Sequence, residues 1–136
     1  MNSLPTLIKL AQRNIDAIGV EIAKGQARIE ELRLQKETSA TKVEVEKALA
    51  SDGLALNLLG GMPVFIERQK WQQEQIDIQI AEIQKGMEEV RERLIAAYRE
   101  KSKLENLATQ YQEKERKELA LKEQAMLDEA ALTRRA

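Results

Sequence analysis

The glutamates Glu88, Glu89 and Glu92 have the spacing that comes nearest to a chemical site. Residues three or four apart lie on one face of a helix, so two of these carboxylates can point the same way, as carboxylates do in di-iron helix bundles. Such bundles also need Glu-x-x-His pairs, and this chain contains no histidine. We therefore interpret the three glutamates as part of a solvent-exposed helix face.

Other kinds of chemistry lack the residues they need. Without histidine the chain has neither the commonest general base nor the commonest zinc ligand, and without cysteine it has no thiolate site. Gly60 and Gly61 are followed by Met62 and Pro63, not by the lysine and hydroxyl residue of a phosphate-binding loop. The sequence predicts no enzyme activity, no metal and no cofactor.

The elements that carry these residues are two helices with regular apolar stripes. In the first, isoleucines recur every seven residues, and a second set follows three residues after each of them. In the second, steps of four and three alternate. A mean period of 3.5 residues is typical of a helix that packs along another helix. The stripes are Ile8, Ile15, Ile22 and Ile29 with Ala11, Ile18, Gly25 and Leu32, and then Ile76, Ile80, Ile83, Met87, Val90, Leu94 and Ala97.

The composition favours a coiled coil over a globular domain. Charged residues make up 33% of the 136 residues and aromatic residues only 3%, whereas large cores depend heavily on aromatic area. We predict an all-α fold, in which two long helices form a single antiparallel coiled-coil hairpin. Its expected parts are helix 1 at about 4–52, a turn at about 53–62 and helix 2 at about 63–130.

Two glycine-containing breaks, Ser51–Gly53 and Gly60–Gly61, place the turn near residue 57. Residue i of helix 1 then lies opposite roughly residue 114 − i of helix 2. From Glu113 onward, helix 2 has no partner inside the chain. Gly25 falls on the seam, and we interpret it and Gly86 as glycines tolerated in long helices; the alternative is a close approach of the two backbones or a bending point.

The charges are balanced and mixed along both helices. The net charge is −1, from 22 basic and 23 acidic residues, so no one-signed basic face is available for nucleic acid. The longest apolar run, residues 54–59, is too short to cross a bilayer, so we expect no transmembrane segment. The absence of cysteine fits a reducing compartment, and we expect a cytoplasmic protein.

Large apolar residues cluster near the predicted turn, where a two-helix tip has little interior. Exposed tryptophan and phenylalanine beside leucines have the composition of a binding hot spot. We expect a partner-contact surface there; the alternative is that these side chains fold back as a plug. The expected contact residues are Leu56, Leu59, Phe65 and Trp71.

Two stretches resemble the FliJ family, the coiled-coil component of the bacterial flagellar type III export apparatus. Residues 90–131 are similar to the C-terminal helix of that family, and residues 7–32 to its first helix. The matching features are an alanine-containing turn, a lysine-leucine-glutamate-x-leucine step and a charged helix that ends in acidic residues and alanines. Here they are Ala97, Lys103, Leu104, Glu105 and Leu107, then Glu113 to Glu118, and Asp128 with Glu129.

The resemblance implies a non-enzymatic stalk or adaptor similar to the central stalk of rotary ATPases. Its terminal end would enter a hexameric export ATPase, and its other expected partners are the cytoplasmic domain of the export-gate membrane protein and export chaperones. It would thus lie in the cytoplasm, at the periphery of the inner-membrane export gate. The expected ATPase-contact residues are Lys101, Lys103, Glu105, Glu113, Lys114, Arg116 and Lys117.

Other functions remain open at this point. An injectisome type III secretion stalk protein is the nearest variant. A different class is a co-chaperone or holdase, a hairpin whose apolar tip binds client proteins. The plainest alternative is a structural spacer that oligomerises through its seam.

Overall fold

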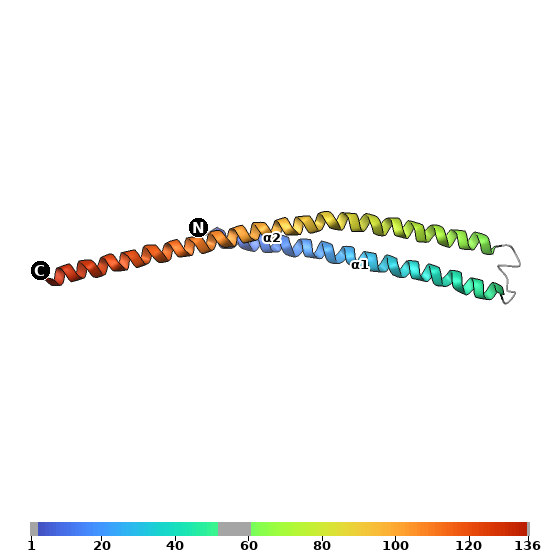
Figure 1. Cartoon of the computed structure of the whole chain (residues 1–136), viewed down its shortest axis with the longest axis horizontal. Helices are drawn as coiled ribbons and strands as arrows, with labels where there is room; N and C mark the ends of the chain where they lie inside the picture. The colour runs from blue at the N-terminus through green and yellow to red at the C-terminus, as the bar shows by residue number, and fades with distance from the viewer. Residues whose placement is uncertain (1–2, 52–60, 136) are drawn as a thin grey trace. The chain divides into compact units, whose positions relative to one another are not determined.

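The computed structural model describes residues 3–51 and 61–135. It contains two long helices, α1 (Leu4–Ser51) and α2 (Met62–Arg135), and the described residues include no strand. The helices pack against each other, as Figure 1 shows for α1 and α2 between residues 17 and 93. The predicted fold class, an all-α hairpin of two helices, is confirmed.

The helix ends follow local signals in the sequence. Leu7 donates its backbone N–H to the carbonyl of Ser3 over 2.9 Å, so Ser3 stands just before the first turn of α1. Phe65 donates in the same way to Gly61 over 2.9 Å at the start of α2. Pro63 lies in that first turn, where its missing N–H costs little.

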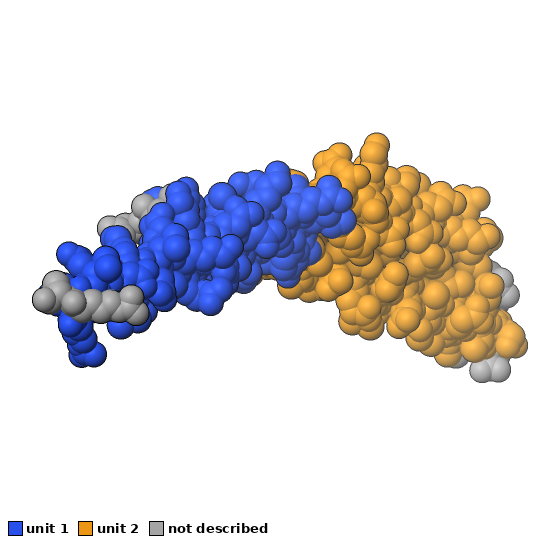
Figure 2. All heavy atoms as spheres, turned by 60° about the vertical axis from the view of Figure 1, so that its left-hand side comes forward, with its two compact units in different colours: residues 1–16, 94–136 blue, residues 17–93 orange. Residues whose placement is uncertain are grey.

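The chain divides into two compact units, which Figure 2 shows in different colours. Unit 2 comprises Ala17–Arg93, and unit 1 comprises Met1–Asp16 with Leu94–Ala136. Each unit thus contains a part of α1 and a part of α2, and each has its own interhelical seam.

In unit 2 the seam keeps the predicted period throughout. Ile18, Ile29 and Leu32 of α1 are buried, as is Met87 of α2, and Leu32 is the most completely enclosed of them with 1% of its surface exposed. The period continues beyond Leu34, although the side chains change character. The buried or half-buried positions there are Lys36, Ser39, Val43, Glu46 and Ala50, and their counterparts on α2 are Met62, Ile66, Gln69, Gln73 and Ile76.

In unit 1 a shorter seam joins the start of α1 to the middle of α2. Leu4, Ile15 and Ala97 are buried in it. On α2 the seam ends at the half-buried Tyr111, and every residue from 112 to 134 is exposed. Figure 1 shows this part of α2 running on beyond the N-terminal end of α1. We call residues 112–135 the overhang.

Within the described parts of α1 and α2, no stretch has the length and hydropathy that a membrane-spanning helix requires.

Candidate protein-contact surfaces

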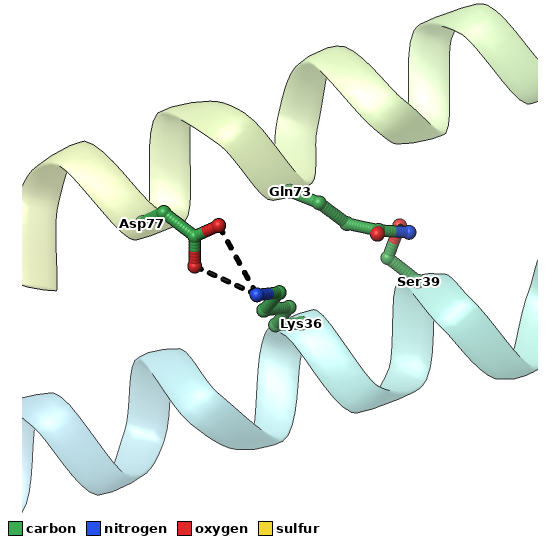
Figure 3. Close-up of polar contacts among 4 residues, drawn as sticks. All are labelled: Lys36, Ser39, Gln73 and Asp77. Carbon is green, nitrogen blue, oxygen red and sulfur yellow. Dashed lines mark hydrogen bonds and ion pairs between the residues drawn. The ribbon is translucent and has the colours of Figure 1, made fainter.

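A polar layer interrupts the seam of unit 2 at Ser39. Its hydroxyl donates to Oε1 of Gln69 over 2.7 Å and accepts from Nε2 of Gln73 over 3.2 Å. Ser39 and Gln69 are both buried, and Figure 3 shows Gln73 reaching from α2 toward Ser39. Because a buried polar group without a partner is costly, the layer favours the one alignment of α1 and α2 that satisfies these groups.

Ion pairs between the helices lie beside the seam and report its register. Nζ of Lys36 lies 2.8 Å from Oδ1 of Asp77, and Arg93 pairs with Glu21 (Figure 3 for the first pair). The expected register places residue 93 opposite residue 21, in agreement with the second pair. All four side chains are substantially exposed, so these pairs align the helices more than they stabilise them.

The predicted tip residues have different surroundings. Leu56 and Leu59 lie outside the described residues. Phe65 is half-buried, and Trp71 has 60% of its surface exposed. Trp71 is therefore available for contact with another molecule, whereas much of Phe65 already packs within unit 2.

Sequence reasoning missed a set of outward-facing apolar residues close to Trp71. Leu34 of α1 is 55% exposed, although it lies within the part of α1 that pairs with α2. The signal for these residues is a second set of apolar positions out of phase with the seam, which becomes visible only once the seam is known. They are Leu34, Val45 and Leu49 on α1, and Val64 and Ile78 on α2.

Of the predicted ATPase-contact residues, Lys101 and Glu105 belong to the seam region of unit 1. Nζ of Lys101 donates to Oε1 of Gln12 over 2.6 Å and lies 3.4 Å from Oε1 of Glu105. Lys101 is half-buried, so it anchors the first part of α1 to α2. Lys103 is exposed on the same helix and lines a shallow depression with Tyr98.

The other four predicted contact residues lie on the overhang. Glu113 and Arg116 pair with each other over 3.0 Å, and Lys114 and Lys117 are exposed. The overhang also exposes large apolar side chains that nothing among the described residues covers: Leu119 (59%), Leu121 (70%), Met126 (70%), Leu127 (65%) and Leu132 (68%).

The glutamates considered first for metal chemistry belong to an exposed part of α2. Glu88 pairs with Arg91, one turn further along, over 2.6 Å. Within the described ranges, no group of three or more histidine, cysteine, aspartate or glutamate residues is placed to hold a metal ion.

Comparison with known proteins shows a match to a protein family. The family model described as "Flagellar FliJ protein" matches residues 1–136. No curated protein and no solved structure matches the chain.

Proposed function

The chain belongs to the FliJ family of flagellar proteins, and on that premise we propose that it is a stalk and adaptor that couples a hexameric export ATPase to the export gate. Membership makes the chain a component of the flagellar protein export apparatus, a type III secretion system, in which the family has a non-catalytic role. It also favours the flagellar function over the injectisome, holdase and spacer alternatives. What the chain contacts within that apparatus is the subject of the proposal.

The observation that carries the proposal is the distribution of apolar side chains around the overhang. At about 100° per residue, Leu119 and Leu121 point to nearly opposite sides of the helix. Met126, seven residues after Leu119, shares the face of Leu119, and Leu132 shares the face of Leu121. All four are exposed. A helix that is apolar on opposite faces suits a partner that encloses it, as the inner surface of a hexameric ring would.

Charged residues on the overhang complement this apolar surface. Lys114, Arg116 and Lys117 alternate with Glu113 and Glu115, so a ring wall carrying both signs of charge can pair with them. Exposed charge pairs act mainly on encounter rate and orientation, and each contributes modestly to affinity. In this proposal the charges orient the overhang and the leucines hold it.

Lys103 extends the proposed ATPase contact toward the body of unit 1. Lys101 and Glu105 contribute to it indirectly, because Lys101 donates to Gln12 of α1 and is itself paired with Glu105, one turn further along α2. The ring would meet this two-helix segment after the overhang has entered. The point where the seam ends, at Tyr111, would then limit the depth of insertion.

In this proposal the other partners bind at the turn between α1 and α2 and at the start of α2. We assign the cytoplasmic domain of the export gate, and export chaperones, to the surface that includes Leu56, Leu59, Phe65 and Trp71. The 60% exposure of Trp71 supports this assignment. The protein would work in the cytoplasm, peripheral to the inner-membrane gate.

The test is stimulation of the cognate hexameric ATPase. Full-length protein should stimulate hydrolysis, and a variant that ends at Gln112 should not. Enclosure is tested by Leu119→Asp and Leu121→Asp, one on each face of the overhang. Both variants should reduce stimulation by at least about tenfold, since each places a charge against an apolar wall.

Two results would contradict this mechanism. Equal stimulation by full-length and truncated protein would remove the overhang from the ATPase contact. A loss confined to one of the two aspartate variants would show a partner that packs on a single side. Glu129→Gln, which changes an exposed charge on the same helix, is the matched control and should retain stimulation.

A further inference from the structure

The part of unit 2 nearest the turn has its apolar residues on the outside. This part comprises residues 34–51 of α1 and 62–78 of α2. Its seam includes Lys36, Ser39 and Glu46, whereas large apolar side chains point away from the seam. The outward residues are 39–60% exposed: Leu34, Val45 and Leu49 on α1, and Val64, Trp71 and Ile78 on α2.

The outward residues recur with the period of a helix-packing surface. On α1, Leu34, Thr38, Thr41 and Val45 follow steps of four, three and four. On α2, Val64, Trp71 and Ile78 are each seven residues apart. This is the same 3.5-residue period that the buried seam has, and it is the spacing at which a neighbouring helix packs. The pattern therefore fits a helical partner better than an extended peptide.

The α1 stripe and Trp71 of the α2 stripe line a groove of unit 2, whereas Val64 and Ile78 do not line it. Leu34, Thr38 and Lys42 line it from α1, and Trp71 and Gln75 line it from α2. A second hollow shares Leu34, Thr38 and Lys42 with the first. It continues along α1 past Val45 and is also lined by Phe65 of α2. We call this continuous surface the side groove. It offers apolar contacts from both helices to a third helix laid along it.

The charges that line the side groove are mostly acidic. Glu31, Glu37 and Glu46 line it, against the single basic residue Lys42. Glu31 already pairs with Arg28 over 3.2 Å, but neither Glu37 nor Glu46 forms an ion pair with another described residue. The same groove of a second copy would carry the same acidic excess, so two such grooves would repel each other. Charge complementarity favours a partner with basic residues beside its apolar stripe.

We propose that the side groove binds an amphipathic helix of a partner protein, with leucine-type residues facing the groove and lysine or arginine on its flanks. The inference deepens the gate and chaperone contact of the proposed function, and it rests on that function for the setting in which the partner is met. Trp71 is shared between the two, whereas Leu34, Thr38 and Val45 are specific to the groove.

The binding test uses two synthetic peptides and the full-length protein. Both peptides have about four heptads with leucine at positions a and d; one has lysine and the other glutamate at positions e and g, so like charges keep each peptide from self-association. Trp71 is the only tryptophan of the chain, so its emission reports directly on the groove. The lysine peptide should shift this emission to the blue with a saturable curve.

The charge and the location of binding are tested separately. The glutamate peptide should bind at least about fivefold more weakly, and the difference should shrink as salt is raised from about 0.05 to 0.5 M. Leu34→Ser and Val45→Ser should each weaken binding of the lysine peptide about tenfold or more, because each removes an apolar contact. Val20→Ser is the matched control: Val20 is 53% exposed in the same unit but does not line the groove, and it should leave binding unchanged.

The proposal is overturned if the lysine peptide gives no saturable change in Trp71 emission, or if Val20→Ser weakens binding as much as Leu34→Ser. Equal binding of the two peptides would overturn the basic character of the partner. Circular dichroism of each variant establishes that it is folded. The titration contains no export component, so a negative result does not contradict the proposed ATPase contact. A negative result in the overhang experiment likewise does not contradict the proposed side groove.

Discussion

Met87 occupies the space above Gly25 in the seam of unit 2. A Cβ atom placed on Gly25 would lie 2.9 Å from Sδ of Met87 and 3.1 Å from its Cγ. The glycine therefore makes room for a long side chain from the facing helix, so Gly25 has a packing contact in addition to being accommodated in a long helix. Nothing lies within 4 Å of such an atom at Gly86, so that residue fits the interpretation as a glycine tolerated in a long helix.

Alanine substitutions at the glycines should separate helix propensity from packing. Gly19 also has nothing within 4 Å of an added Cβ, so Gly19→Ala should raise the free energy of unfolding by about 0.5–1 kcal/mol. Gly25→Ala should raise the free energy of unfolding by less, because the side chain of Met87 has to shift to make room for the added Cβ. Urea unfolding followed by circular dichroism measures both values. Equal stabilisation by the two variants would show that Met87 moves aside at no cost.

The polar layer at Ser39 should be sensitive to the loss of one partner. Ser39→Ala leaves the buried amide of Gln69 without its donor, which should lower the free energy of unfolding by about 1–3 kcal/mol. The double variant Ser39→Ala with Gln69→Leu should recover part of that loss, since position 69 then needs no partner, whereas Gln73 still lacks its acceptor. A double-mutant cycle measures the coupling, and additive effects would contradict the hydrogen bond between the two residues.

Leu32 and Leu34 are a matched pair on α1, one inside the seam and one outside. Leu32 is 1% exposed and Leu34 is 55% exposed. Leu32→Ala should lower the free energy of unfolding by about 2–5 kcal/mol, through lost burial and an unfilled cavity. Leu34→Ala should change it by under about 1 kcal/mol. Thermal unfolding of both variants checks this difference, and similar melting temperatures would place Leu32 outside the core.

Removal of the overhang should leave the rest of the fold unaffected. Every residue from 112 to 134 is exposed, so a chain that ends at Gln112 loses no buried contact. Its urea midpoint should match that of the full-length protein. Amide hydrogen exchange should be fast in the overhang and slow around Leu32 and Met87, because exposed helices open with little cost. Strong protection of the overhang amides in the isolated protein would indicate self-association.

The seams were predictable from the sequence because they repeat. Isoleucines seven residues apart fix the buried face of α1, and the single break fixes which residues of α2 face it. The contact between Gly25 and Met87 was not predictable, since it depends on the register to within one residue and on a side-chain rotamer. The hydrogen bonds that join Ser39 to Gln69 and Gln73 were not predictable for the same reason.

The candidate surfaces were predictable only in part. Trp71 stood out by its residue type, and it is exposed. Leu34 and Val45 did not stand out, because an apolar residue off the seam looks like ordinary surface variation until the seam has been located. Leu56 and Leu59 lie outside the described residues, so their place at the tip remains a prediction.

The exposure of every residue from 112 to 134 bears on how long a complex made by the overhang would last. An isolated helix of this kind owes its order to helix propensity and to local pairs such as Glu113 with Arg116. A partner that binds the overhang must offset the conformational entropy that the overhang loses on binding, and this reduces the net affinity gained from the contacts. The residence time should therefore be short for the apolar area involved, and one copy could leave one assembly and enter another without unfolding the paired helices behind it.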